Sequence, residues 1–287
     1  MKMFEFKKNV WLFGVVLLGV FTVSMWVRYQ QFETWKKTPA TYFVGERPMM
    51  TTLDAPYWLR ISREYNEGVF RQKGGLRGYP AHQQSSGTFS MPEKYRDTLD
   101  EDSGMHKGIS STEVRYRDVP LLSYMISQLA PFFDLNYYLA GTLLIPLLAS
   151  LFILPLGYYF FCIGLPLPGL LGGLIGTFAG GYYMRSAIGR IDTDMLNLFF
   201  PVLAGLLILL AGKTKTERNV LLYSIGAGLS LFLFQWWYSK AGFTLAYFML
   251  LVFSLFVNQI RFRTILAGAF LFVLCALPST FRSLVSN

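Results

Sequence analysis

The chain has 287 residues, of which 53% are hydrophobic and only 15% charged, and its net charge is +9. Thirteen of the 17 acidic residues and 17 of the 26 Lys and Arg residues precede Val119, and nearly continuous apolar sequence follows. This distribution excludes an ordinary soluble domain and predicts an all-α, polytopic integral membrane protein. Much of the excess positive charge lies in short loops between apolar runs, where membrane orientation explains it, so we expect no nucleic-acid partner.

The first apolar run, residues 10–27, follows three lysines and is long enough to span a bilayer. It ends in Arg28 and polar residues rather than in the small residues of a signal-peptide cleavage site. We therefore interpret this run as an uncleaved anchor with the N-terminus inside.

A long polar loop, residues 29–118, separates this anchor from the rest, and loops of such length are usually either functional or disordered. Within it, Asp54 is a plausible helix N-cap. The residues after Asp54 have helical spacing, which predicts a loop helix: Tyr57, Trp58, Ile61 and Tyr65. The part from 72 to 111 is rich in Gly, Ser and Gln and is expected to be mobile. Its histidines, His82 and His106, lack ligand spacing and are interpreted as surface residues.

Beyond the loop, residues 119–130 are apolar but too short to span, which favours a helix on the membrane surface. Six further spans are predicted: 137–161, 164–183, 195–211, 220–236, 241–257 and 264–277. Pro146 and Pro155 predict a tilt or kink in the first of these. Gly172, Gly176 and Gly180, at a spacing of four, predict a flat face for close helix packing.

Short basic loops indicate the orientation of these seven spans, because such loops are typically cytoplasmic. With the N-terminus inside, the loops that fall inside are the basic ones: Lys213, Lys215 and Arg218, then Arg261 and Arg263. The long first loop and the turn around Asp192 are then both outside, and so is the C-terminus.

The stretch 181–195, between two apolar runs, holds two of the four acidic residues that follow Asp118. Asp192 and Asp194 open a span, so helix capping is one interpretation. The other is metal binding, because paired carboxylates suit Mg²⁺ or Mn²⁺. Asp54, expected on the same outer face, would supply a ligand from a second segment.

Two arginines and several aromatic residues lie near these aspartates in the sequence. Arg185 is expected to pair with an aspartate or to hold a phosphate. Arg190 could do either, but a plain interfacial cation is the simpler interpretation. The run 236–238, Trp-Trp-Tyr, stands where an aromatic belt is expected. Arg190, Tyr183 and Trp237 are candidate substrate-binding residues.

Several motifs together resemble a known family. Tyr182-Tyr183-x-Arg185 followed by Asp192-Thr193-Asp194-Met195 resembles the second external-loop motif of the oligosaccharyltransferase catalytic subunit, the STT3/PglB family. Asp54, in an Asp-x-x-Tyr context, is similar to that family's first acidic motif. Trp236-Trp237-Tyr238 and the proline-led segment 120–124 are also similar to bacterial members. The resemblance spans roughly residues 10–280.

The resemblance implies a GT-C glycosyltransferase that moves an oligosaccharide from a polyprenyl diphosphate to Asn in an Asn-x-Ser/Thr sequon of an acceptor polypeptide. It implies that Asp54 and Asp192 bind the metal ion, Mn²⁺ or Mg²⁺, and that Asp194 and Arg185 organise the catalytic site. The metal would neutralise the departing pyrophosphate, with inversion at the sugar carbon. The active face would be extracytoplasmic, at the cell inner membrane in a bacterium.

The sequence also departs from that family, whose members continue through further spans into a soluble domain with a Trp-Trp-Asp-Tyr-Gly motif that reads the sequon. This sequence ends at Asn287 and contains neither that motif nor the family's Glu in a later external loop. We therefore expect residues 1–287 to form the N-terminal membrane part of the enzyme, without the C-terminal soluble domain. Either the chain is a fragment or truncated product, or it works with a separate C-terminal half as its partner. Alone it is expected to be inactive or nearly so.

Two other functions remain open at this stage. A different GT-C enzyme, using polyprenyl-phosphate sugars, would keep outer aspartates but need no sequon reader. A transporter or a non-catalytic membrane scaffold is the third reading. Transporters usually place ionisable groups near the bilayer midplane, and the predicted spans are almost free of them.

Overall fold

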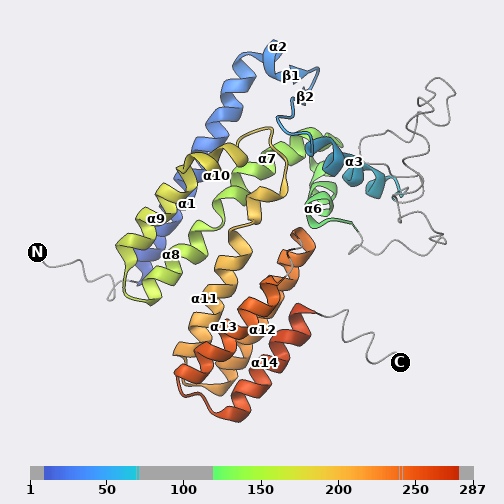
Figure 1. Cartoon of the computed structure of the whole chain (residues 1–287). Helices are drawn as coiled ribbons and strands as arrows, with labels where there is room; N and C mark the ends of the chain where they lie inside the picture. The colour runs from blue at the N-terminus through green and yellow to red at the C-terminus, as the bar shows by residue number, and fades with distance from the viewer. Residues whose placement is uncertain (1–9, 69, 71–118, 239, 241, 278–287) are drawn as a thin grey trace, which may run out of the picture.

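The computed structural model describes residues 10–68, 70, 119–238, 240 and 242–277 (Figure 1). This part of the chain is almost entirely helical, as expected for an all-α membrane protein. Within it, the one sheet is a two-residue antiparallel pair, β1 (Phe43–Val44) with β2 (Arg47–Pro48). Residues 72–111 and both histidines, for which the sequence predicts mobility and surface positions, lie outside the described residues.

One group of helices forms the upper left of the molecule in Figure 1. It contains α1 (Val10–Lys37), α7 (Tyr137–Ser150), α8 (Ile153–Cys162), α9 (Pro166–Phe178) and the short α10 (Gly180–Arg185). Helix α1 packs on α7, α8 and α9. It runs ten residues beyond the predicted span, so the first external loop begins later than residue 29.

The predicted kink between residues 137 and 161 is confirmed as a break between α7 and α8. Pro155 has no N–H to donate to the carbonyl of Leu151, and the chain there makes tighter turns instead, such as Leu154 N–H to Leu151 O at 3.2 Å. A second break, at Ala179 between α9 and α10, was not expected from the sequence; Ala179 has extended ψ of 125°.

A second group lies below and to the right: α11 (Phe199–Lys213), α12 (Glu217–Trp237), α13 (Phe243–Val257) and α14 (Phe262–Ala276). These four helices pack on one another around a buried core that includes Ala227, Leu251 and Phe272. Helix α11 also packs against α8, and this contact joins the two groups.

The remaining elements cover the upper end: α2 (Pro39–Tyr42), α3 (Ala55–Asn66), α6 (Leu121–Leu129) and the 3₁₀ helices η4 (Ala130–Phe133) and η5 (Thr193–Leu196). Helix α3 is the loop helix that the aromatic spacing predicts. Helix α6, expected on the membrane surface, packs against α3 and α7 and buries Leu122 and Ile126 completely or nearly so.

All seven predicted spans are helical, with shifted ends. Four segments are long and apolar enough to cross a membrane: Val10–Lys37, Tyr137–Cys162, Thr193–Lys213 and Glu217–Trp237. Helices α9, α13 and α14 are apolar but shorter, at 13, 15 and 15 residues. The lengths and composition together identify an integral membrane protein.

The predicted glycine face of α9 is wrong in detail. A side chain at Gly172 or Gly180 would have open space around it, and one at Gly176 would meet only the ring of Phe152 at 3.7 Å. The close approach to α8 is made instead by Gly169 and Gly173, which lie four residues apart on an adjacent side of the helix. Both pairs of glycines have a spacing of four, and only the packing partner decides which pair is used.

The short loops at the lower end of Figure 1 are basic and contact one another. Lys213, at the end of α11, donates to the carbonyl of Cys162 at the end of α8. Arg261, before α14, pairs with Glu217 at the start of α12 at 3.0 Å. The ends of four helices therefore lie together, opposite to the end that carries Asp54 and Asp192.

Candidate functional site at the upper end of the bundle

The two loops that carry the predicted site residues are hydrogen-bonded to each other. The backbone N–H of Thr51 donates to the carbonyl of Gly189 at 3.0 Å, although 138 residues separate them. Gly189 has a φ of +81°, and a Cβ there would lie 2.8 Å from the carbonyl oxygen of Met49. Glycine is therefore required for the contact, which brings Asp54 and Asp192, each three residues further along, to one region.

Buried packing beneath the loops fixes the same arrangement. Ile191 is fully buried, and its Cδ1 lies over the backbone of Gly141 in α7, beside Leu59 of α3. Ala55, the first residue of α3, belongs to the same apolar cluster. The residues next to both Asp54 and Asp192 are thus anchored in a common core, and the carboxylates stand at its outer edge.

Asp54 lies directly before α3 but does not act as the predicted side-chain cap, because its side chain makes no capping hydrogen bond. Its backbone is in the right-handed helical region, where the side chain is not aimed at the free amides of the first turn. Asp54 therefore occupies the predicted N-cap position, as the carbonyl that accepts from Trp58 N–H shows, but it does not cap the helix through its side chain. Its carboxylate is half-buried at the site edge and contributes to the local negative potential.

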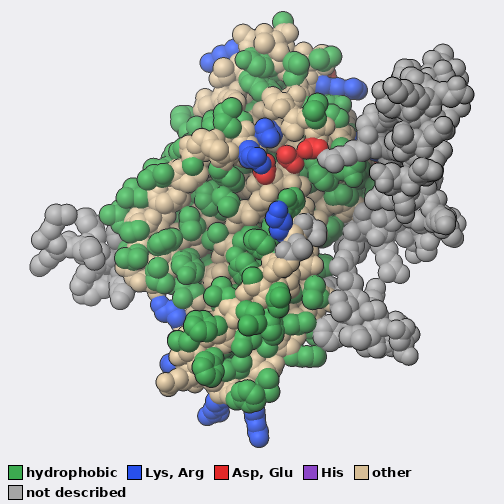
Figure 2. All heavy atoms as spheres, in the orientation of Figure 1, with side chains coloured by type: hydrophobic (Ala, Val, Ile, Leu, Met, Phe, Trp, Pro, Cys, Tyr) green, Lys and Arg blue, Asp and Glu red, His purple; other side chains and the backbone are tan. Residues whose placement is uncertain are grey.

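Asp192 does cap the short helix η5, accepting a hydrogen bond from the N–H of Thr193 at 2.7 Å. Burial raises the pKa of the Asp192 carboxyl, and the charges of Asp194 and Asp54 raise it further. The Thr193 hydrogen bond and the charge of Arg190 act in the opposite direction. Asp192 is therefore within electrostatic reach of both other carboxylates, and Figure 2 shows acidic side chains gathered beside basic ones on this face.

Asp194 and Arg185 form the ion pair that the sequence predicts as one of two roles for Arg185. Arg185 Nη1 lies 3.4 Å from Asp194 Oδ2, and the Arg185 side chain is 64% exposed. The amide of Asn197 donates to the other oxygen of Asp194 at 3.3 Å. Asp194 is thus held from two sides, while most of the guanidinium of Arg185 faces solvent and can reach a ligand.

Two aromatic side chains hold the carbonyls of the Asp192–Asp194 turn from below. Trp237 Nε1 donates to Thr193 O at 2.6 Å, and the hydroxyl of Tyr182 lies 3.1 Å from Met195 O. Trp237 is only 3% exposed. Trp237, predicted to bind substrate, therefore lies beneath the turn and positions it.

The other two predicted substrate-binding residues lie on either side of this turn. Arg190 is half-buried, acts on the charge of Asp192, and its buried Nε has no hydrogen-bond partner among the described residues. Tyr183 is also half-buried, and the guanidinium of Arg28 lies over its ring at 5.3 Å. Of these two residues, Arg190 is the one with a polar atom, Nε, that could donate to a ligand.

Arg28 is the residue of this region that sequence reasoning missed, because it was read as the polar end of the first span. It is fully buried within α1. Its Nη2 donates to Thr177 O and Ser186 Oγ, both at 3.0 Å, and its Nη1 donates to Ser24 Oγ and Thr177 Oγ1, both at 2.8 Å. Its Nε donates to Ser186 O at 3.3 Å. Arg28 thereby ties α1 across the break between α9 and α10, next to Arg185.

The side chains around the acidic turn fit a divalent cation only if water or substrate supplies further ligands. Among the described residues, no three His, Cys, Asp or Glu side chains are gathered closely enough to hold a metal ion by themselves. Magnesium-like ions, however, commonly use one or two carboxylates together with water and substrate phosphates. The negative charges that Asp54 and Asp194 bring to bear on Asp192, and the buried Oδ1 of Asn197, which has no hydrogen-bond partner among the described residues, fit such an ion.

The chain was also compared with known proteins. The family model for Oligosaccharyl transferase STT3, N-terminal, matches residues 118–285, more than half of the chain. The match includes the Asp192–Asp194 turn, Arg185 and Trp237, while Asp54 precedes it. No curated protein matches the sequence.

Proposed function

The chain belongs to the STT3 family of oligosaccharyl transferases, and from that premise we propose that it transfers an oligosaccharide from a polyprenyl diphosphate to the Asn of an Asn-x-Ser/Thr sequon. In this proposal the chain supplies the N-terminal half of the catalytic subunit. The observation that carries it is the hydrogen bond between Thr51 and Gly189, because this contact unites Asp54 with the Asp192–Asp194 turn.

In the proposed site, Asp54 and Asp192 hold Mn²⁺ or Mg²⁺. A bound divalent cation would supply Lewis-acid stabilisation of the leaving diphosphate. Arg185, paired with Asp194 but largely exposed, is placed to donate hydrogen bonds to phosphate oxygens. Asp194, held by Arg185 and Asn197, keeps that guanidinium at the site. In this proposal the acceptor amide attacks the sugar carbon from the side opposite the leaving diphosphate, so that the transfer inverts that carbon.

We propose further that this site faces the extracytoplasmic side of a multi-pass protein, the inner membrane in a bacterium. Support comes from the opposite end of the bundle, where the short loops carry most of the nearby positive charge: Lys213, Lys215, Arg218, Arg261 and Arg263. Short basic loops mark the cytoplasmic side of membrane proteins.

The test is reconstitution of the chain in vesicles with a lipid-linked oligosaccharide, a sequon peptide and Mn²⁺. The reaction is run with and without a separately supplied C-terminal half of the family enzyme. A peptide with Gln in place of the acceptor Asn is the substrate control. Glycopeptide formation that requires the sequon Asn and stops on chelation of the metal supports the proposal.

Two isosteric variants address the metal ligands. Asp192→Asn keeps an oxygen that can accept from Thr193 N–H but removes the charge, so it separates capping from metal binding. Asp54→Asn does the same for the other segment. Each is expected to lower transfer by at least about a hundredfold, whereas Glu217→Gln, an exposed acid at the basic end, should leave it unchanged. Full transfer by the double Asp54 and Asp192 variant would overturn the metal assignment.

A further inference from the structure

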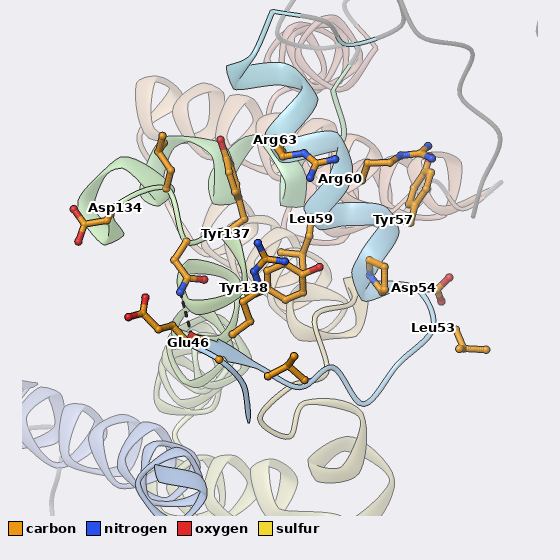
Figure 3. Close-up of a pocket in the computed structure, with 16 residues that line it drawn as sticks. Glu46, Leu53, Asp54, Tyr57, Leu59, Arg60, Arg63, Asp134, Tyr137 and Tyr138 are labelled. Atoms are coloured by element: carbon orange, nitrogen blue, oxygen red, sulfur yellow. Dashed lines mark hydrogen bonds between the residues drawn. The ribbon is translucent and has the colours of Figure 1, made fainter. Parts of the chain in front are cut away.

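A cavity of about 960 Å³ adjoins the acidic site, and Asp54 is the residue of that site that lines it (Figure 3). Its walls come from three segments: the β1–β2 hairpin, the first turns of α3, and the loop that leads from η4 into α7. Asp54 stands at one edge, so a ligand in the cavity would adjoin the proposed reaction centre. The volume is at the upper end of the range for small-ligand sites, which is about 300–1,000 Å³.

The lining combines aromatic rings with hydrogen-bonding groups of both signs. Figure 3 shows the rings of Tyr137 and Tyr138 between the hairpin and α3, with Tyr57 on the far side. The charged lining side chains are balanced, three arginines against three carboxylates: Arg47, Arg60 and Arg63, and Glu46, Asp54 and Asp134.

The charge balance argues for a neutral ligand. Two of the arginines already have carboxylate partners on their own helix, Arg60 with Glu64 at 3.4 Å and Arg63 with Glu67 at 3.7 Å. The third, Arg47, lies over the ring of Tyr138 at 5.5 Å. A phosphate or other polyanion would meet carboxylates on the same walls and gain little net attraction.

The walls are held in place by local structure. The side-chain amide of Asn136 donates to the carbonyl of Glu46 at 3.2 Å, and its oxygen accepts from Leu139 N at 3.0 Å. One residue thus caps α7 and fastens the hairpin over the cavity. Asp134 and Leu135 both have a left-handed backbone, with φ of 52° and 60°. Non-glycine residues adopt this conformation only at an energetic cost, and such strained residues cluster at ligand-binding sites.

We propose that this cavity binds the neutral sugar units of the donor glycan that lie beyond the reducing-end sugar, whose anomeric carbon forms the bond to the acceptor. The inference rests on the proposed function, because it places the reducing-end sugar at Asp54. Sugar rings present an apolar C–H face that stacks on tyrosine and hydroxyls that pair with carboxylate, amide and guanidinium groups. The lining offers these groups together, beside the reaction centre, on walls that are already ordered.

The experiment measures glycan binding directly, without requiring transfer. The chain in lipid nanodiscs is titrated with two free neutral tetrasaccharides, chitotetraose and maltotetraose, and with the monosaccharides, by saturation-transfer NMR. Tyr138→Leu removes the aromatic stacking surface and keeps an apolar side chain against the core cluster that Tyr138 contacts. Arg47→Gln changes an exposed side chain on the cavity wall and leaves the helices intact. Tyr158→Leu, in α8 at the other end of the molecule, is the matched control.

The wild-type chain should bind at least one tetrasaccharide more tightly than its monosaccharide. Tyr138→Leu should weaken that binding by roughly three- to tenfold, the range expected for one aromatic contact. Arg47→Gln should weaken it as well, and Tyr158→Leu should not. Absence of tetrasaccharide binding in the wild type, or equal binding by Tyr138→Leu and Tyr158→Leu, overturns the inference.

A parallel kinetic arm separates this inference from the proposed function. Donors carrying one sugar or four on the same polyprenyl diphosphate are compared in the transfer assay. Loss of the advantage of the longer donor in Tyr138→Leu supports the glycan site. A rise of KM for the sequon peptide alone would assign the cavity to the acceptor and overturn it. Failure of every donor to react, with tetrasaccharide binding intact, counts against the proposed function and not against the cavity.

Discussion

Gly189→Ala should disrupt the hydrogen-bonded contact between Thr51 and Gly189 that joins the two loops. An L-residue in left-handed backbone at φ +81° costs about 1–2 kcal/mol. The new methyl group would lie 2.5 Å from Trp35 Cη2 and 2.8 Å from Met49 O, and the latter is backbone that cannot move without the loop. Overpacking of this kind costs about 1–3 kcal/mol, and loss of the Thr51 hydrogen bond about 0.5–1.5. Together these contributions predict a total destabilisation of about 2.5–6.5 kcal/mol.

Two alanine variants serve as controls, because they separate strain from collision. Gly164 has a similar φ of +86° but open space around it, so Gly164→Ala should show only the strain of about 1–2 kcal/mol. Gly205 lies within α11, with open space and no positive φ, so Gly205→Ala should be neutral or slightly stabilising.

The assay is thermal unfolding of the three purified variants in one detergent, together with the transfer reaction. The unfolding midpoint should be highest for Gly205→Ala, lower for Gly164→Ala and lowest for Gly189→Ala. Transfer by Gly189→Ala should fall further than its stability alone explains, because Asp54 moves away from Asp192. If Gly189→Ala unfolds no earlier than Gly164→Ala, the close contact between the two loops is refuted.

Two further variants test what holds the site. Trp237→Phe leaves the buried carbonyl of Thr193 without its donor and should lower stability by about 1–3 kcal/mol. Trp236→Phe, the control, loses a similar hydrogen bond to the carbonyl of Val119, so the two variants should unfold at the same temperature. Trp237→Phe should nevertheless lose more transfer activity, and equal transfer by the two variants would contradict the role of Trp237. In Arg28→Lys the ammonium group cannot replace the five guanidinium N–H donors, so the variant should be destabilised by at least about 3 kcal/mol. Thermal unfolding measures this loss, and an unfolding midpoint equal to that of the wild type would contradict it.

The fold class was predictable because the apolar runs are long and the charges are confined to loops. The helix α3 was predictable from its aromatic spacing, and the break before Pro155 from the missing amide hydrogen. The break at Ala179 carries no such residue signal. The packing face of α9 was mispredicted, because two pairs of glycines with a spacing of four lie on adjacent sides of the helix and the sequence does not say which pair meets α8.

The candidate residues of the acidic turn could be predicted from the sequence, but the residues that hold the turn in place could not. The pairing of Arg185 with Asp194 was anticipated as one of two roles. Arg28 was interpreted only as the start of the polar end of the first span, because a buried arginine is recognised only when its neutral partners, Thr177 of α9 and Ser186 after α10, are in place. The role of Trp237 depends likewise on a carbonyl more than forty residues away.

The most direct test of the account is Mn²⁺ binding by electron paramagnetic resonance to the reconstituted chain and to Asp54→Asn, Asp192→Asn and the double variant. If one ion joins the two loops, each single substitution weakens binding by at least about tenfold, and the double variant loses less free energy than the sum of the two. Unchanged affinity in Asp54→Asn, or losses that add as for independent sites, would contradict a shared site.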